Sequence, residues 1–392
     1  MVNVDQSLFD STIHTAADEF DKQGHHPNIL VVGATGAGKS SLVNTIFGVD
    51  FAQTGTGKPI TQTTTKYTIE NMPINLFDTK GYELGSEEHT RFLEEMHTYM
   101  EDQNKPVQEQ IHMVWYVISA SNHRITDLDL EMIEKFRVIG KPICIIFTKC
   151  DLVSESTLQD LSQVLQDHRI NYFYVSTALP EMDYIQLSHL VEWSYEHMDY
   201  SVRFAFLRSQ TVNLKLIRSE VNKVIREYVL HAIGHSAKNK SVEDIMNLQG
   251  EMLYTIFKQY NLETHSIKFM PFLNKLVQIY LEEKDKDKDK DKDEKGKKKQ
   301  NKNQEDEKQK KSKDLKEKLK EAGIEFLIKG TIATTSTLAV GYTASEICYR
   351  INKAKVKNKT LNVQQYVDEH FKESDVKNLF YQFNKKKNNK DE

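Results

Sequence analysis

Short apolar runs separated by amphipathic stretches cover residues 28 to 200. The runs are nearly continuous in apolar residues, which is typical of strands that are buried on both faces of a sheet. They are Asn28 to Val32, Lys66 to Glu70, Ile74 to Phe77, Ile111 to Ile118, Pro142 to Phe147 and Asn171 to Val175. Apolar positions with helical spacing lie between and after these runs, for example at residues 126–133 and 184–193. This alternation predicts an α/β fold with a mostly parallel sheet flanked by helices and a ligand site at the carboxyl ends of the strands.

After residue 200 the pattern becomes helical. Apolar positions recur at three- and four-residue spacing from Phe204 to Tyr228, ending near Gly234, and again over Ile245 to Phe257 and Phe269 to Leu281. These repeats predict an all-helical C-terminal domain. Residues 282–313 instead alternate Lys and Asp, which sets like charges four residues apart and leaves nothing to bury, so we expect a disordered insertion. A tether that binds an acidic surface is the alternative for this insertion.

The predicted organisation therefore has six parts. A lead-in helix covers residues 1–27, and the α/β domain covers 28–200. The helical domain comes in two parts, 201–281 and 314–384, separated by the charged insertion 282–313, and a basic tail covers 385–392.

An apolar stretch rich in small residues covers residues 323–349. Its Gly, Ala, Thr and Ser suit close helix packing or membrane insertion. Residues 329–349 approach the length of a membrane span, but Thr, Ser and Glu346 interrupt them. Basic residues follow up to Lys359, as they would beside an anionic leaflet. A buried helical hairpin is the preferred reading, and contact of residues 324–359 with a membrane surface is the alternative.

Composition narrows these possibilities. The chain has 392 residues, of which 39% are hydrophobic, so two folded units with ordinary cores are expected. A formal net charge of −4 argues against a nucleic-acid partner bound through bulk charge. The three cysteines have no metal-type spacing, and the first residues do not form a signal peptide. We expect a cytoplasmic protein, membrane-associated if residues 324–359 reach lipid.

Residues 33–40 read GATGAGKS and lie between the first strand and a helical pattern. In this context the glycines let backbone N–H groups point at a β-phosphate, and the following helix adds its positive end. Lys39 is expected to reach the β and γ phosphates, and the Ser40 hydroxyl to bind Mg²⁺. The predicted phosphate-binding residues are Thr35, Gly36, Ala37, Gly38, Lys39, Ser40 and Ser41.

Three further motifs follow later strands. Asp78 begins the motif Asp-Thr-Lys-Gly, in which its carboxylate would serve the metal and the N–H of Gly81 would meet a γ-phosphate. Asp151 can accept hydrogen bonds from the N1 and N2 donors of guanine, which adenine does not present. The predicted base-binding residues are Thr148, Lys149, Asp151, Ser176, Thr177 and Ala178. The cofactors are therefore expected to be GTP or GDP and Mg²⁺, with ATP as a remote alternative.

The stretch from Gly55 to Tyr67 is rich in Gly and Thr and is expected to be a mobile or ligand-ordered loop. One of its threonines should coordinate Mg²⁺ when a γ-phosphate is present. Thr61 is preferred for this role, with Thr64 or Thr65 as alternatives. The predicted metal ligands are thus Ser40, Thr61 and Asp78, and the predicted catalytic residues are Lys39, Thr61 and Gly81.

Taken together, these motifs resemble the Era-like G domains of the translation-factor-related P-loop GTPases. The resemblance spans residues 28–200 and rests on GATGAGKS, the loop with Pro-Ile-Thr, DTKG, the run from Val114 to Ile118 with Arg124 beyond it, and TKCD. It departs from the family at Thr148, which replaces the usual Asn as in dynamin-like and immunity-related GTPases, and at Lys80, which replaces Pro. The first departure implies weaker affinity for the base.

The residue after Gly81 is Tyr82, where Ras-like proteins carry the glutamine that positions the attacking water. The resemblance therefore implies slow intrinsic hydrolysis, with help from a switch residue, a dimer partner or an activating protein. Arg124 is a candidate for that help. The preferred alternative for Arg124 is an ion pair with Asp127 or Asp129.

The pairing of Met246 to Tyr260 with the Gly/Ala/Thr segment resembles the small domain of unknown function that follows some membrane-associated Era-like G domains. The first functional reading is a Mg²⁺-dependent GTPase switch coupled to a partner or membrane through its helical domain. The second is an assembly protein with little turnover, in which GTP drives homodimerisation through the G domain, as in septins or dynamins.

Overall fold

The computed structural model describes residues 26–48, 55–59, 64–69, 72–79, 87–102, 105–166, 169–180, 182, 185–237, 242–262, 332–358 and 360–385. Several sequence predictions lie outside these residues: the lead-in helix up to residue 25, the charged insertion, the helix at 269–281, the basic tail beyond 385, and Thr61, Lys80, Gly81 and Tyr82. The chain divides into two compact units between Leu216 and Ile217.

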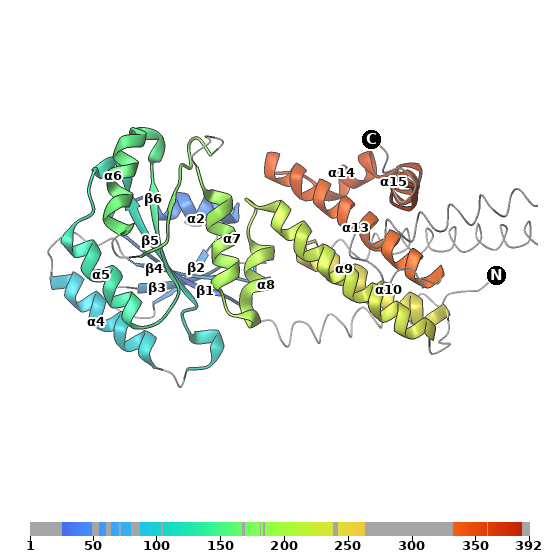
Figure 1. The fold of residues 1–392 in the computed structure, drawn as a ribbon, viewed down its shortest axis with the longest axis horizontal. Helices are drawn as coiled ribbons and strands as arrows, with labels where there is room; N and C mark the ends of the chain where they lie inside the picture. The colour runs from blue at the N-terminus through green and yellow to red at the C-terminus, as the bar shows by residue number, and fades with distance from the viewer. Residues whose placement is uncertain are drawn as a thin grey trace, which may run out of the picture. The chain divides into compact units, whose positions relative to one another are not determined.

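The α/β unit is built on a seven-stranded sheet with the order β2-β3-β4-β1-β5-β6-β7 (Figure 1). The strands are β1 Asn28–Val32, β2 Gly55–Pro59, β3 Thr64–Ile69, β4 Asn75–Thr79, β5 Met113–Ser119, β6 Ile143–Thr148 and β7 Tyr172–Tyr174. Strands β4, β1, β5, β6 and β7 pair in parallel, and β2 and β3 continue the sheet antiparallel at one edge. The predicted mostly parallel sheet is confirmed, and the six expected strands lie within two residues of the observed ones.

Helices cover both faces of this sheet, which explains why its central strands are apolar throughout. They are α2 Lys39–Phe47, α4 Glu87–Glu101, α5 Asp127–Val138, α6 Glu155–Gln166, α7 Leu187–His197 and α8 Tyr200–Ser209. Helices α4, α5 and α6 share one core with inward residues of β1, β5 and β6. On the other face, Phe47 of α2 and Phe206 of α8 pack on Trp115 of β5.

The expectation of a loop from Gly55 to Tyr67 is wrong for both ends of that stretch. Residues 55–59 form strand β2, which pairs antiparallel with β3 in the register Gly57 to Tyr67. Strand β2 cannot be recognised from the sequence pattern, because its residues Gly-Thr-Gly-Lys-Pro show no apolar alternation. It is an edge strand, formed by backbone hydrogen bonds to β3 alone. Pro59 ends the strand, a position where its missing N–H is tolerated.

The second unit is helical, as predicted. Its helices are α9 Leu214–Ala237, which starts in the α/β unit, α10 Val242–Gln259, α13 Ile332–Lys357, α14 Val363–His370 and α15 Glu373–Lys385. Helix α13 packs on α10, α14 and α15. A Cβ atom on Gly341 would lie 2.9 Å from Cγ2 of Ile225 and 3.2 Å from Sδ of Met252, so this glycine lets α13 approach α9 and α10 closely.

Two helix boundaries differ from the sequence expectation. The run of apolar positions from Phe204 to Tyr228 is broken at residues 210–213, between α8 and α9, and α9 continues through Gly234 to Ala237. The described part of the expected hairpin at 323–349 is one helix, α13. In the part of the chain that the structure describes, no helix combines the length and apolarity of a membrane span.

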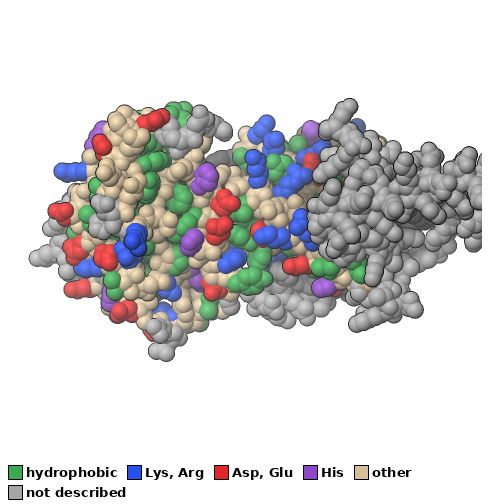
Figure 2. Space-filling model, viewed as in Figure 1, with side chains coloured by type: hydrophobic (Ala, Val, Ile, Leu, Met, Phe, Trp, Pro, Cys, Tyr) green, Lys and Arg blue, Asp and Glu red, His purple; other side chains and the backbone are tan. Residues whose placement is uncertain are grey.

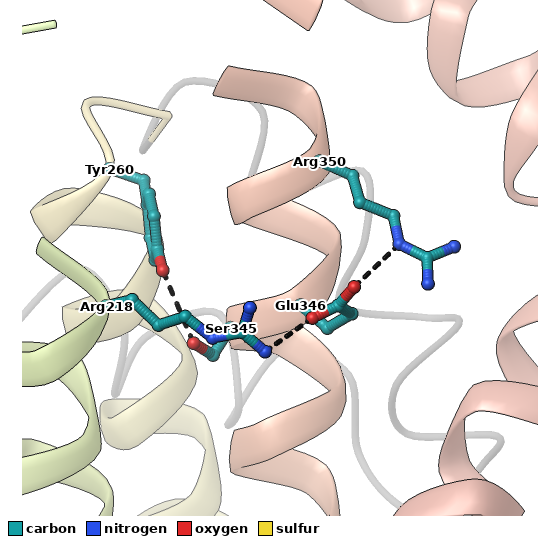
Figure 3. Close-up of polar contacts among 5 residues, drawn as sticks. All are labelled: Arg218, Tyr260, Ser345, Glu346 and Arg350. Carbon is teal, nitrogen blue, oxygen red and sulfur yellow. Dashed lines mark hydrogen bonds and ion pairs between the residues drawn. The ribbon is translucent and has the colours of Figure 1, made fainter. Parts of the chain in front are cut away.

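The polar residues that interrupt the apolar stretch are engaged within the helical unit (Figure 3). Glu346 bridges two arginines, with its Oε2 atom 2.6 Å from Arg218 Nη2 on α9 and its Oε1 atom 2.8 Å from Arg350 Nε. Ser345 directly precedes Glu346 in the chain, and its hydroxyl group lies 3.4 Å from that of Tyr260. These contacts explain why a charged residue is accommodated in the middle of α13.

Candidate nucleotide-binding site

The predicted site residues gather at one edge of the sheet because they follow parallel strands. In the strand register, Val31 lies opposite Asp78, Val32 opposite Tyr116, and Ser119 opposite Thr148. The P-loop after β1, Asp78 in β4 and the Thr-Lys-Cys-Asp motif after β6 are thus brought to the carboxyl edge, where ligands bind in open α/β sheets. Only the backbone of Asp78 is described, and Thr61 and Gly81 lie outside the described residues.

The P-loop depends on its glycines. Gly33 has a φ of 154°, and a Cβ atom there would lie 2.2 Å from the carbonyl oxygen of Val117, so the loop rests directly on the backbone of β5. Gly36 and Gly38 have φ angles of 76° and 95°, in the left-handed region that other residues adopt at a cost. Gly38 is also the N-cap of α2 and supplies no side-chain cap, so the first N–H groups of this helix remain available to an anion.

Two lysines hold the P-loop carbonyls. Lys39 Nζ donates to Gly33 O at 2.8 Å and to Ala34 O at 3.3 Å, so its ammonium group lies inside the turn of the loop. Lys149, which follows β6, donates from its Nζ atom to Gly36 O at 2.8 Å. Lys149 itself has a φ of 56°, which turns the chain after β6 towards the P-loop. Both lysines were predicted site residues, and in the structure Lys39 bonds the start of the loop while Lys149 bonds its middle.

Thr148 joins the P-loop, residues 33–40, to the loop that contains Asp151, which is expected to bind the guanine base. Its side chain is buried, and its Oγ1 atom donates to the carbonyl oxygen of Ala37 and lies 3.4 Å from that of Ile118. A Cβ atom on Gly38 would lie 3.2 Å from the same hydroxyl, so the two segments are in close contact. Threonine at this position therefore links two motifs through a hydroxyl group where the family usually carries an amide.

The base loops are also joined to each other. Cys150 N donates to Val175 O at 3.3 Å, which sets the loop containing Asp151 beside the loop containing Ser176 to Ala178. Ser176 is buried, and its Oγ atom accepts from Leu179 N at 2.9 Å. Burial raises the pKa of the Cys150 thiol to about 12, so this residue is a neutral packing group between the two loops. Asp151 is half-buried beside it.

The alternatives for the switch threonine differ in their surroundings. Thr64 is buried in β3, and its hydroxyl lies 3.2 Å from Met96 Sδ on α4, so it belongs to the core in this structure. Thr65 of β3 lies opposite Asp78 of β4. Strand β4 therefore separates Thr65 from β1, the strand that leads into the P-loop. The choice among Thr61, Thr64 and Thr65 stays a prediction.

Arg124 is exposed and lines a cavity of about 300 Å³ together with Ala34 and Ala37 of the P-loop. The expected ion pair of Arg124 is not formed among the described residues. Asp129 instead accepts from Thr126 N at 2.9 Å and Thr126 Oγ1 at 2.6 Å, in the capping box of α5, and from the hydroxyl of Tyr116 at 2.8 Å. The carboxylate of Asp129 therefore caps helix α5 and does not form the ion pair with Arg124 that the sequence had predicted.

One contact at the rear of the P-loop helix was missed from the sequence. The carbonyl oxygen of Ile46, in the last turn of α2, accepts hydrogen bonds from Thr211 N at 2.8 Å and Thr211 Oγ1 at 3.2 Å. The sequence offered one signal for this region, since Asn213 is a favoured N-cap residue that marks the start of a new helix.

The sequence of the chain is similar to those of known GTP-binding proteins. Residues 28–149 match the family described as 50S ribosome-binding GTPase. The probable GTP-binding protein EngB of Limosilactobacillus reuteri is 30% identical over 151 residues, which are 38% of this chain and 74% of that protein. Cell division control protein 10 of Saccharomyces cerevisiae is 25% identical over 190 residues, which are 42% of this chain and 59% of that protein.

The chain thus spans a little over half the length of the cell division control proteins that it matches. A crystal structure of a probable GTP-binding protein EngB aligns with 43% of this chain and 97% of its own, at 15% identity and a TM-score of 0.33. The matched segment contains the P-loop, the Asp-Thr-Lys-Gly motif and β6 with Thr148 and Lys149. The chain therefore belongs to the GTP-binding proteins of the P-loop GTPase class and carries a GTPase domain related to EngB.

Proposed function

We propose that the protein binds GTP and GDP together with Mg²⁺, hydrolyses GTP slowly, and acts as a nucleotide-dependent switch. The observation that carries this proposal is the pair of bonds from one motif to the P-loop, from Thr148 to Ala37 O and from Lys149 to Gly36 O. They set Asp151 and Lys39 at the same edge of the sheet. A guanine base and its phosphates need these groups on neighbouring loops.

Each residue has a role in this proposal. The P-loop N–H groups and Lys39 hold the phosphates, and Asp151 accepts the two donors that distinguish guanine from adenine. Ser40 is exposed at the first turn of α2, where its hydroxyl can bind Mg²⁺. We expect the metal to bind together with the nucleotide, because Mg²⁺ bridges oxygens of the β and γ phosphates.

Slow hydrolysis is proposed from the sequence. Tyr82 lacks the side-chain amide that orients a water molecule in Ras-like proteins, so the rate should depend on a group from elsewhere. Arg124 lines a cavity beside the P-loop and is not paired with Asp127 or Asp129, which supports it as one source of positive charge. Lys39, Thr61 and Gly81 are the proposed contacts to the reacting phosphate.

The helical unit is proposed to couple nucleotide state to a partner or to a membrane surface. Figure 2 shows Lys and Arg side chains gathered over part of its described surface. Helix α13 carries exposed Arg350, Lys353 and Lys357, and no acidic residue lies between Ile347 and Asn358. An anionic surface fits this charge distribution. We also propose the domain order given above, with the G domain extended from the expected end at residue 200 to include α8, because the α/β unit reaches Leu216.

A second candidate function is GTP-dependent assembly with little turnover. Two exposed leucines favour it, because Leu152 follows Asp151 and Leu179 follows Ala178, with exposed fractions of 65% and 52%. Both lie beside the proposed base site, so a second copy that covered them would also cover the nucleotide. Homodimerisation through the G domain is therefore the form of assembly that we propose.

Single-turnover hydrolysis of GTP by the full chain, measured across protein concentrations, separates the two candidates. A slow rate that is independent of concentration supports the switch, and a rate that rises with concentration supports activation by dimerisation. The Lys39→Ala variant is the control for site-specific turnover. Binding of GTP without any turnover would reject the enzyme, and failure to bind GTP or GDP would reject both candidates.

A further inference from the structure

The C-terminal end of the P-loop helix is bonded to the segment that begins helix α9. The last four carbonyl groups of a helix have no partner within the helix. One of them, that of Ile46, receives both the N–H and the hydroxyl of Thr211. Gly48 ends α2 with a φ of 71°, and a Cβ atom there would lie 3.1 Å from Cγ2 of Thr211. Thr211 is therefore held against the end of α2 by two hydrogen bonds and by close packing.

The segment that carries Thr211 is itself firmly built. Gln210 is buried, and its side chain accepts from Asn213 N at 2.7 Å and donates to Asn213 O at 3.1 Å, so it spans the turn around Thr211. Asn213 Oδ1 accepts from Leu216 N at 2.9 Å and caps the first turn of α9. Helix α9 thus begins three residues after Thr211, and hydrogen bonds fix the turn between them. The helix then continues into the helical unit.

Aromatic packing fixes the same end of α2. Phe47, the last residue of the helix, stacks on Trp115 with ring centroids 6.0 Å apart. Phe206 of α8 contacts both rings edge-on, at 6.3 and 6.4 Å. All three side chains are fully buried. Because close-packed interiors transmit small displacements, the end of α2 and the segment between α8 and α9 should move together.

The other end of α2 carries Lys39 and Ser40. A short α-helix is stiff along its axis, so a shift at its N-terminus on phosphate binding reaches Ile46. We propose that Thr211 is a positioning residue that couples nucleotide state in the P-loop to helix α9, and through α9 to the helical unit. This inference rests on the proposed GTP binding and names the route by which that site is regulated. Coupling is reciprocal, so a partner bound to the helical unit would change nucleotide affinity by the same factor.

Thr211→Val in the full chain tests the proposal. Valine keeps the shape and the N–H bond but removes the hydroxyl that donates to Ile46 O. The matched control is Thr45→Val, which removes a hydroxyl from the same helix, where it donates to Ser41 O at 2.9 Å within the helix. Amide hydrogen exchange in α9 and α10 is measured with GDP, with a non-hydrolysable GTP analogue and without nucleotide. Affinity for both nucleotides is measured in parallel.

In the wild type and in Thr45→Val, nucleotide should change the exchange of α9 amides beyond residue 217. In Thr211→Val this response should be largely lost, and the ratio of the two nucleotide affinities should shift by roughly 2- to 10-fold, the range of one neutral hydrogen bond. Thr211→Ser, which restores the hydroxyl, should restore the response. A role in stability alone would lower the melting temperature without changing the affinity ratio.

The outcomes also separate this inference from the proposed function. Nucleotide binding in the wild type with no change in α9 or α10 would overturn the coupling and leave the GTPase assignment intact. A full response in both Thr211→Val and Gly48→Ala, which crowds the contact from the side of α2, would overturn it as well. Failure of the wild type to bind nucleotide would reject the proposed function, and the coupling with it.

Discussion

Replacing Thr148 with Val tests how the P-loop is tied to the base loop. The substitution keeps the side-chain shape and removes the hydroxyl that donates to the buried carbonyl of Ala37. A buried acceptor that loses its donor costs about 1–3 kcal/mol. For a domain of this size each kcal/mol lowers the melting temperature by about 2–4 °C. Because the loop must keep this conformation to bind phosphate, we also expect nucleotide affinity to fall about tenfold, equivalent to about 1.4 kcal/mol.

The assay is titration of the full chain with fluorescent GDP, together with thermal unfolding followed by circular dichroism. Thr148→Ser retains the hydroxyl and should bind and melt close to the wild type. Thr148→Asn supplies the amide that the family usually carries and should keep or raise the affinity. The reasoning is refuted if Thr148→Val binds GDP and unfolds as the wild type does, because the hydroxyl would then contribute nothing to the loop.

Three other perturbations test separate parts of the structure. Gly33→Ala should abolish nucleotide binding, since its Cβ would lie 2.2 Å from Val117 O. Gly140→Ala, at a φ of 78° in open space, should reduce stability by only about 1 kcal/mol. Nucleotide titration and melting curves compare the two variants. Glu346→Ala should destabilise the helical unit, because it leaves two arginines without their shared partner, while Glu346→Gln should be milder; proteolysis of the helical unit reports both. Stability should fall between about pH 9 and pH 12, because burial raises the pKa of Cys150 in the folded state to about 12 and the unfolded thiol ionises first. Urea unfolding measures the free energy of unfolding across this range, and Cys150→Ala should make its decrease with pH less steep.

The central sheet could be predicted from the sequence because its strands are buried on both faces and therefore carry continuous apolar runs. Strand β2 could not be predicted, since an edge strand such as Gly55–Pro59 is defined by backbone hydrogen bonds to β3 and not by a side-chain pattern. The break between α8 and α9 could not be predicted either, because apolar spacing is similar on both sides of residues 210–213. Local pattern carries no information on which helix end a turn will bind.

The candidate site shows the same division. The P-loop and the base loop could be located from motifs because their chemistry needs fixed residue types at fixed spacing. The contacts between them could not, since the bond from Thr148 to Ala37 joins positions that are 111 residues apart in the chain. The predicted ion pair between Arg124 and Asp129 was also wrong, because the Asp129 carboxylate accepts hydrogen bonds from Thr126 in the capping box of α5.

The most direct test of the account is competition binding at Asp151. The full chain and its Asp151→Asn variant are titrated with fluorescent GTP in Mg²⁺, and GTP, ATP and xanthosine triphosphate compete for the site. The carboxylate accepts the two donors of guanine, while an amide would instead donate to the O2 atom of xanthine. We predict that GTP outcompetes ATP in the wild type and that the variant prefers the xanthine nucleotide. Equal competition by ATP and GTP in the wild type would contradict it.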